Sequence, residues 1–217
     1  MSRSGDMEET TRVAAPKATT RIWEDSSVNA EAPGTTSAPM TTAFSVPAPL
    51  SSADELLSRL RDSGLTLATA ESLTGGLLSS AVVDIPGSSS VFRGGVISYA
   101  TDIKHSILGV EQRLLDNGGP VQAEVALQMA LGVARLMDAS LGLSTTGVAG
   151  PGDSEEGPQG LVYVAAVLTS LEDRTHEESI EVVSKHRFEG SREQVRAQSV
   201  DAALALSAEL LRTFREN

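Results

Sequence analysis

Cysteine is absent from the 217-residue chain. Disulfide bonds, thiolate metal sites and a cysteine nucleophile are therefore excluded, and any covalent catalysis must use another side chain. The absence of cysteine also fits a protein that works in a reducing compartment.

Positive charge is scarce: 17 Lys and Arg residues stand against 29 Asp and Glu residues, which gives a net charge of -12. This balance argues against nucleic acid or an anionic membrane surface as a partner, because both need clustered basic side chains. A small anionic ligand remains compatible, since one or two basic side chains and exposed backbone N–H groups are enough to hold it.

Long hydrophobic runs are also missing. No stretch approaches the roughly 20 apolar residues that cross a bilayer, and the N-terminus has no apolar centre of a secretion signal. Residues 1–50 are rich in Thr, Ala, Ser and Pro, without apolar periodicity. We therefore expect a cytoplasmic protein with a disordered tail over residues 1–50, in which Ile22-Trp23 and Phe44-Ser45-Val46 are either isolated apolar residues or a short docking segment.

Apolar periodicity begins near Ser51 and predicts one domain over residues 51–217, in which helices and strands alternate. This alternation indicates an α/β sheet covered by helices. In such folds, ligands bind at the carboxyl ends of the strands. The expected helices cover residues 52–64, 76–83, 102–108, 123–138 and 191–215, and the expected strands cover residues 65–69, 95–100, 143–148, 160–169 and 180–188.

The stretch T-L-A-T-A-E-S-L-T-G-G, residues 66–76, lies where the first of these strands passes into a helix. It places the hydroxyl of Ser72 beside the backbone N–H groups of Thr74, Gly75 and Gly76. Such N–H groups and the helix dipole stabilise an oxyanion or hold a phosphate. The alternative is structural: a hydroxyl that caps the helix, with glycines that form a tight turn.

A serine nucleophile needs a base, and Lys104 is the candidate. Tyr99 lies at the end of the strand predicted at residues 95–100, and Lys104 follows in a short helix from which its amine can reach Ser72. A lysine base requires a pKa about three units below the ordinary value of about 10.4 to act near neutral pH. None of the three histidines has an Asp and a Ser in a suitable sequence context, and a solvated lysine is the alternative.

Two further groups complete the expected pocket. The glycine-rich run Gly147–Gly152 follows a buried strand, where it forms either a pocket wall or a turn with positive φ angles. Arg192 and Arg196 lie one turn apart on the last helix; Arg192, at the helix N-terminus, is the better candidate for an anion, and Arg196 for a solvated side chain. The acidic side chains of residues 153–156 are expected to be solvated, and no metal site is predicted.

These motifs occur together in an order that closely resembles the C-terminal domain family of the CinA competence-damage proteins, which includes stand-alone nicotinamide-nucleotide amidohydrolases. The resemblance covers about residues 52–214. The motifs that carry it are Thr69-Ala70-Glu71-Ser72-Leu73-Thr74-Gly75-Gly76, Asp84-Ile85-Pro86-Gly87-Ser88-Ser89, Gly95-Val96-Ile97-Ser98-Tyr99, Lys104, Leu108-Gly109-Val110, Thr146-Gly147-Val148-Ala149-Gly150-Pro151 and Gly160-Leu161-Val162-Tyr163.

The resemblance implies a three-layer α/β/α sandwich that hydrolyses nicotinamide mononucleotide to nicotinate mononucleotide and ammonia, with no metal or organic cofactor. It also implies a homo-oligomer. Ser72 would be the nucleophile, Lys104 its general base and Tyr99 a hydrogen-bonding support. The residues implied in substrate binding are Glu71, Thr74, Gly75, Gly76, Thr146, Gly147, Gly150 and Arg192.

Two motifs depart from the family's pattern. Leu73 replaces the usual Cys after the nucleophile, which changes packing and leaves Ser72 in place. The usual Tyr-Ser-Asn-Glu-x-Lys becomes Tyr-Ala-Thr-Asp-Ile-Lys, so the spacing from Tyr99 to Lys104 is kept while the polar residues between them differ. The alternative function is a catalytically silent module that binds a pyridine nucleotide or engages a partner related to competence or DNA damage.

Overall fold

The computed structural model describes residues 20–25, 53–169 and 179–215. Its strands are β1 (Thr20–Asp25), β2 (Leu67–Glu71), β3 (Phe92–Ile97), β4 (Leu141–Gly147), β5 (Leu161–Thr169) and β6 (Ser179–Arg187). They form one sheet in the order β1-β6-β5-β4-β2-β3. β2 pairs in parallel with β3 and with β4, whereas β5 runs antiparallel to β4 and to β6.

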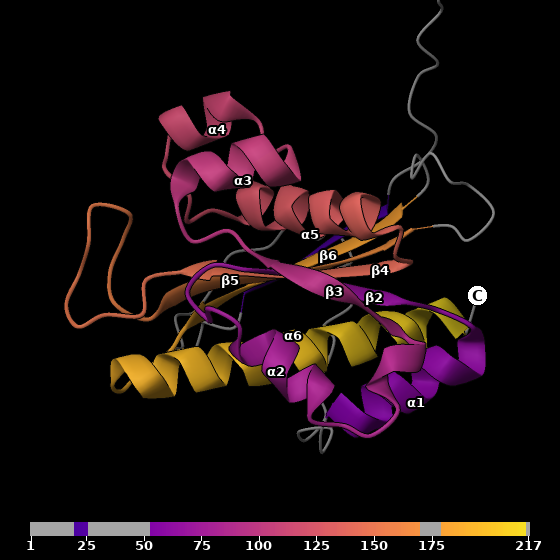
Figure 1. Cartoon of the computed structure of the whole chain (residues 1–217). Helices are drawn as coiled ribbons and strands as arrows, with labels where there is room; N and C mark the ends of the chain where they lie inside the picture. Colours follow the sequence, from indigo (N-terminus) through magenta and orange to yellow (C-terminus); the bar gives the residue numbers. More distant parts are fainter. Residues whose placement is uncertain (1–19, 26–52, 170–178, 216–217) are drawn as a thin grey trace, which may run out of the picture.

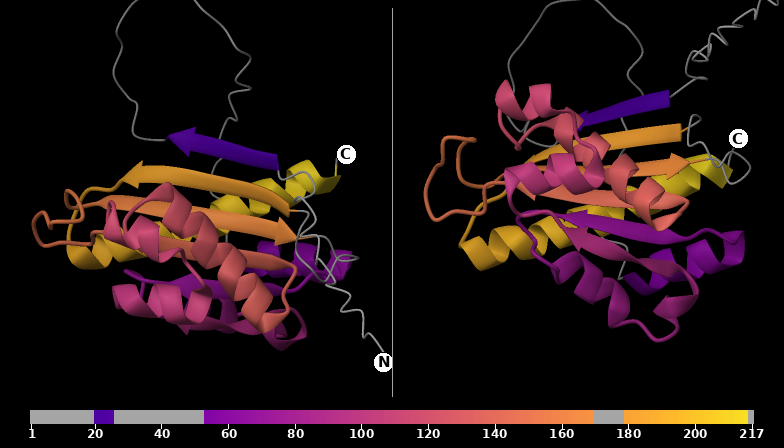
Figure 2. Two further views of the ribbon diagram at one scale, coloured as in Figure 1. Left: turned by 90° about the horizontal axis from the view of Figure 1, so that it is seen from above. Right: turned by 45° about the horizontal axis from the view of Figure 1, so that its top comes forward.

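Helices cover both faces of this sheet (Figure 1). On one face lie α1 (Ala53–Ser63), α2 (Leu77–Val83) and α6 (Arg192–Arg215). On the other face lie α3 (Thr101–Leu108), α4 (Gln112–Asp116) and α5 (Ala123–Met137). The two further views in Figure 2 show the sheet between these two layers. The predicted three-layer α/β/α sandwich is therefore confirmed.

α5 packs against the centre of the sheet because its apolar residues recur at helical spacing. Val125, Met129 and Val133 are completely buried, and burial of such side chains stabilises a fold by about 1.5–3 kcal/mol each. The approach is closest at Gly142 of β4, where a Cβ would lie only 2.0 Å from the carbonyl oxygen of Ala130. The contact therefore requires glycine there, and it holds the turn that precedes α5 beside the carboxyl end of β4.

Most elements lie where the sequence predicts them, but the first two predicted strands are displaced along the chain. The strand expected at residues 65–69 is β2 at residues 67–71, and the strand expected at residues 95–100 is β3 at residues 92–97. The pattern does not predict α4, which has five residues. An element of that length contains too few apolar positions to reveal a period.

β1 corrects part of the prediction of a disordered tail over residues 1–50. Residues 20–25, which include Ile22-Trp23, pair in parallel with the outer side of β6. Arg21 also forms ion pairs with Glu181 of β6 at 2.8 Å and with Glu124 of α5 at 2.9 Å. These partners are 160 and 103 positions away along the chain, so local composition contains no trace of them. The tail's other apolar segment lies outside the described residues.

Among the helices that the structure describes, none combines the length and apolar composition needed to cross a membrane. The longest helix, α6, illustrates the reason. It has 24 residues but carries charged side chains along its length, including Arg192, Glu193 and Arg196 in its first two turns.

Candidate active site

Ser72 is the first residue after β2, at the carboxyl end of a central strand. Its backbone N–H donates to the carbonyl oxygen of Thr145 at 3.0 Å, so the neighbouring strand β4 holds it in place. The chain then turns sharply, because Gly75 and Gly76 adopt φ angles of 59° and 101°, which side chains other than hydrogen rarely tolerate. The turn leaves Ser72 only 8% exposed at the base of a pocket.

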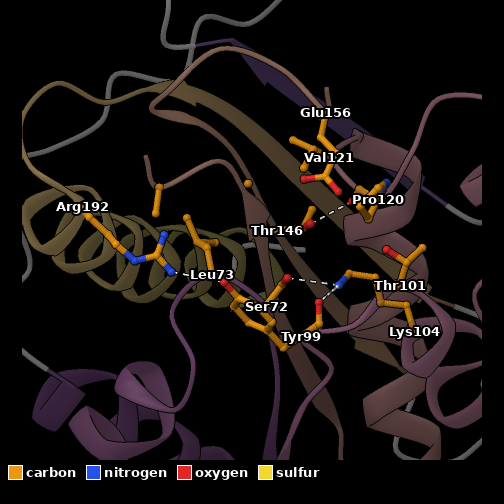
Figure 3. Close-up of a pocket in the computed structure, with 12 residues that line it drawn as sticks. Ser72, Leu73, Tyr99, Thr101, Lys104, Pro120, Val121, Thr146, Glu156 and Arg192 are labelled. Carbon is orange, nitrogen blue, oxygen red and sulfur yellow. Dashed lines mark hydrogen bonds between the residues drawn. The ribbon is translucent and has the colours of Figure 1, made fainter. Parts of the chain in front are cut away.

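Lys104 reaches Ser72 from the helical layer on the other face of the sheet from α2 (Figure 3). It lies on α3 and is 1% exposed. Its Nζ atom is 3.1 Å from Ser72 Oγ, 2.6 Å from the carbonyl oxygen of Ser98 and 3.3 Å from that of Tyr99. The predicted contact between Ser72 and Lys104 is therefore present, within proton-transfer distance.

The three oxygen partners of the Lys104 amine accept hydrogen bonds from its charged form, and they also allow proton transfer from Ser72 once the amine is neutral. The carbonyl oxygens of Ser98 and Tyr99 can only accept hydrogen bonds, whereas the Ser72 hydroxyl can donate. A neutral amine has two N–H groups and one lone pair. It satisfies both carbonyls with its N–H groups and turns its lone pair toward Ser72, where it can take the hydroxyl proton.

Burial favours the neutral amine. Loss of hydration lowers the pKa of Lys104 from 10.5 to about 8, while the negative charge of Glu156 acts in the opposite direction. With this pKa, roughly a tenth of Lys104 is uncharged at pH 7. The shift has the direction that the sequence analysis requires but is smaller than three units, and burial causes it, without a neighbouring positive charge among the causes.

The pocket around Ser72 has a volume of about 140 Å³ and is partly open to solvent. The predicted site residues that line it are Ser72, Tyr99, Lys104, Thr146, Gly147 and Arg192. Ala149, in the glycine-rich run predicted as a possible pocket wall, also lines it, whereas sequence reasoning missed Leu73, Thr101, Pro120, Val121 and Glu156. Pro120 is held there because its carbonyl oxygen accepts a hydrogen bond of 2.8 Å from the Thr146 hydroxyl. Glu156 belongs to the acidic run that the sequence analysis expects to be solvated, and it remains exposed at the pocket mouth.

Tyr99 and Arg192 meet at the rim. The side chain of Tyr99 is 61% exposed, and its hydroxyl accepts a hydrogen bond of 3.2 Å from Arg192 Nη2. Arg192 Nη1 donates to the carbonyl oxygen of Gly150 at 2.8 Å. Gly150 thus fixes the arginine rather than lining the pocket itself, and Tyr99 reaches Lys104 through its backbone carbonyl instead of its phenol.

Glu71 does not reach the pocket, which corrects its expected role in substrate binding. Its carboxylate is completely buried and accepts hydrogen bonds from the backbone of Gly76 at 2.9 Å, Leu78 at 3.0 Å and Ser79 at 2.8 Å. The Ser79 hydroxyl donates as well, at 2.5 Å. Glu71 therefore satisfies the free N–H groups at the start of α2. Successive side chains of a strand point to opposite faces of the sheet. Glu71 therefore faces the helical layer that contains α2, whereas Ser72 faces the layer that contains Lys104.

Thr74, Gly75 and Gly76 also serve the turn, which corrects their expected contact with substrate. The Thr74 hydroxyl bonds to that of Thr145 at 2.7 Å in the interior. The N–H of Gly75 donates to the carbonyl oxygen of Ser72, and the N–H of Gly76 donates to Glu71. The amides of Gly75 and Gly76 are thus occupied and do not form an oxyanion site.

Arg196 fixes the same turn from α6, a role that neither sequence-based alternative described. Its Nε donates to the carbonyl oxygen of Leu73 at 2.9 Å, and its Nη2 donates to that of Thr74 at 2.7 Å. A trans peptide directs its N–H opposite to its C=O, so the Thr74 amide points away from Arg196. Among the described residues, none accepts a hydrogen bond from the amides of Leu73 or Thr74. Of these two residues, Leu73 lines the pocket beside Ser72, whereas Thr74 is completely buried.

Within the described ranges, no three His, Asp or Glu side chains are grouped in a way that could hold a metal ion. In the turn between β4 and β5, the carboxylate of Asp153 has a structural partner. Asp153 accepts a hydrogen bond of 2.8 Å from the backbone of Gln159, and the Gln159 side chain bonds to Gly152 and Gly190.

A family model described as the CinA C-terminal domain matches residues 50–211. The chain belongs to this family. The turn that contains Ser72, the segment after β3 that contains Tyr99 and the helix with Lys104 all lie inside the matched region, so the whole pocket is part of the CinA-type domain.

Individual relatives agree with this assignment. The chain is 42% identical over 146 residues to a CinA-like protein of Frankia casuarinae, a match that covers 67% of this chain and 32% of the relative. The chain spans about a third of the length of the curated relatives it matches. The match therefore does not assign the whole activity of those longer proteins to this chain.

Solved structures share the fold of the CinA-type domain. The competence/damage inducible protein CihA of Agrobacterium tumefaciens superposes with a TM-score of 0.65 at 33% identity, covering 74% of this chain and 93% of that chain. A CinA superfamily protein of Escherichia coli superposes with a TM-score of 0.66 at 28% identity, covering 80% and 94%.

Proposed function

We propose that the CinA-type domain hydrolyses the carboxamide of nicotinamide mononucleotide, giving nicotinate mononucleotide and ammonia. The observation that carries this proposal is the 3.1 Å contact between Ser72 Oγ and Lys104 Nζ at the base of a pocket. A serine beside a buried amine of lowered pKa is an arrangement suited to acyl transfer from an amide. The resemblance of the motifs to nicotinamide-nucleotide amidohydrolases supplies the substrate.

In the acylation step, neutral Lys104 takes the Ser72 proton while Oγ attacks the carboxamide carbon. The carbonyl oxygen becomes an oxyanion, and the free amide of Leu73, a residue that lines the pocket, is the donor suited to stabilise it. The charged amine stays held by the carbonyls of Ser98 and Tyr99. It then returns its proton to the leaving nitrogen as the C–N bond breaks, which releases ammonia and leaves an ester on Ser72.

Deacylation uses the same two side chains. Lys104, neutral again, takes a proton from a water molecule, whose oxygen attacks the ester carbon. The second oxyanion collapses, the bond to Ser72 Oγ breaks, and Lys104 returns the proton to Oγ. The carboxylic acid product gives its proton to solvent or to the released ammonia and leaves as the carboxylate of nicotinate mononucleotide, and neither step needs a redox change.

Arg192 is the side chain suited to the substrate's phosphate. It is exposed at the rim, and two of its five N–H groups are fixed by Gly150 and Tyr99. A guanidinium held in this way loses less conformational freedom when it binds a phosphate. The negative charge of the whole chain does not oppose such a local contact.

Ammonia release from nicotinamide mononucleotide by the purified full chain tests the proposal. We expect turnover with formation of one nicotinate mononucleotide per ammonia, and at least tenfold (~1.4 kcal/mol) lower kcat/KM with free nicotinamide, which lacks the phosphate. Binding of the nucleotide without any ammonia would favour the catalytically silent module. Faster turnover of a different amide would identify another amidohydrolase.

The rate of ammonia release should rise with pH through an apparent pKa of about 8. Only neutral Lys104 can accept the Ser72 proton. Because the pKa of Lys104 lies below the ordinary lysine value, the neutral form appears within this pH range, and below the pKa its fraction falls about tenfold per pH unit. The measurement is kcat/KM from about pH 6 to about pH 9, with circular dichroism to verify folding at each pH. A flat profile over that range would contradict the assignment of Lys104 as the base.

A further inference from the structure

Glu156 places a carboxylate at the mouth of the pocket. The proposed general base in this pocket, Lys104, must be uncharged to act. Among the described residues that line the pocket, Glu156 is the only acidic side chain. Its charge favours the protonated form of Lys104 and so opposes the proposed chemistry. The Glu156 carboxylate, which favours protonated Lys104 in the free protein, has a different effect once a charged ligand binds in the pocket.

The position of Glu156 is set by a fixed turn. Ser154 and Gly157 form backbone hydrogen bonds of 2.9 and 3.2 Å with each other, and the N–H of Glu156 donates to the Ser154 hydroxyl at 3.2 Å. The side chain of Gln159 ties the same segment to α6 through the carbonyl oxygen of Gly190. Figure 1 shows this β4–β5 connection as a long projecting loop at the end of the sheet, and Ser72 lies at the same end because β2 and β4 are parallel.

Glu156 and Arg192 lie apart at the pocket (Figure 3). Glu156 is beside Val121, whereas Arg192 approaches from the α6 side, with Ser72 and Thr146 between them. No described Lys, Arg or His lies within ion-pair distance of the Glu156 carboxylate. The pocket therefore presents a positive group in one place and an unpaired negative group in another.

We infer that Glu156 recognises the positive charge of the substrate's ring, so that the pocket selects a pyridinium carboxamide over a neutral aromatic amide of the same shape. This inference rests on the proposed function. Nicotinamide mononucleotide carries a phosphate, which suits Arg192, and a quaternary ring nitrogen, which suits an unpaired carboxylate. Free nicotinamide and neutral aryl amides carry no such ring charge.

Ring binding also changes the environment of Lys104. The charged or titratable residues that line the pocket with Lys104 are Tyr99, which follows β3, Glu156 from the β4–β5 loop and Arg192 from α6, while Asp102 and His105 are its sequence neighbours on α3. A cationic ring offsets the Glu156 carboxylate and adds positive charge near the amine. The lysine then loses its proton more readily in the complex than in the free protein, so the substrate assists the formation of its own base.

The test compares nicotinamide mononucleotide with benzamide riboside 5′-phosphate, in which a carbon replaces the charged ring nitrogen. Dissociation constants are measured on the Ser72→Ala background, with and without Glu156→Gln. We expect Glu156→Gln to weaken binding of the cationic ligand about tenfold and to change binding of the neutral ligand less than about twofold. Glu155→Gln, a neighbouring exposed side chain outside the pocket lining, is the matched control and should change neither.

Turnover gives a second readout. In Glu156→Gln, the pH limb of kcat/KM should move below about 8, because the carboxylate no longer favours protonated Lys104. With the original Glu156, the limb of kcat should lie below that of kcat/KM. Equal weakening of both ligands, or of neither, would overturn the inference. Since binding is measured without turnover, this outcome is distinct from failure of the proposed amidase activity.

Discussion

Replacing Ser72 by alanine should lower the rate of ammonia release from nicotinamide mononucleotide at least about a thousandfold. The substitution removes the hydroxyl oxygen that Lys104 Nζ contacts at the base of the pocket. Without it, water must attack the amide directly, and no acyl-enzyme forms. The measurement is kcat by an ammonia-coupled assay, together with a search for the acylated protein by mass spectrometry.

Binding should survive the same substitution. The phosphate and ring contacts assigned to Arg192 and Glu156 do not involve Ser72, so the dissociation constant should change by less than about fivefold. Ser80→Ala, which removes an exposed hydroxyl from α2, is the matched control and should leave kcat unaffected. Retention of more than a tenth of the original kcat in Ser72→Ala would exclude a serine nucleophile.

Replacing Glu71 by glutamine should lower the free energy of unfolding by about 3 kcal/mol. The buried carboxylate accepts hydrogen bonds from three backbone amides and one hydroxyl. A glutamine keeps one acceptor oxygen and turns an NH₂ group toward donors, so at least one buried N–H loses its partner. Urea titration measures the effect as a lower midpoint at an unchanged slope.

A surface substitution provides the comparison for Glu71→Gln. Glu55 pairs with Arg59 one turn away on α1 at 2.7 Å, and both side chains are partly exposed. Glu55→Gln should cost less than about 0.5 kcal/mol, because such pairs contribute little in water. If Glu71→Gln left stability unchanged and raised only the KM for the nucleotide, Glu71 would be a binding residue and the correction drawn from its burial would be wrong.

The contrast between Glu71 and Ser72 illustrates how far the sequence predicts the site. Their adjacent positions in one motif suggest a shared role, and the motif does place both at the end of a strand. The alternation of a strand sends them to opposite layers: Ser72 faces Lys104, whereas Glu71 faces the start of α2. The predicted strand ends at residue 69, two residues before β2 ends, so the prediction does not extend the alternation of side chains to Glu71 and Ser72.

Glu156 and Arg196 illustrate the second limit. A run of acidic residues in a loop is usually solvated, and so is an arginine on an exposed helix, so composition does not reveal a further role for either residue. Glu156 is exposed, as expected, but it also lines the pocket and acts on the charge of Lys104, whereas Arg196 donates to the carbonyls of Leu73 and Thr74. These contacts join segments that are far apart along the chain, and no local pattern encodes them.

The order of helices and strands, the serine at a strand end followed by two glycines, and the spacing from Tyr99 to Lys104 were determined by the sequence alone. Those features depend on local periodicity and backbone geometry. The tertiary structure decided which amides stay free, which carboxylate faces the pocket, and how much the pKa of the lysine falls. Burial and hydrogen-bond satisfaction depend on neighbours brought together by folding, so they exist only in the assembled layers.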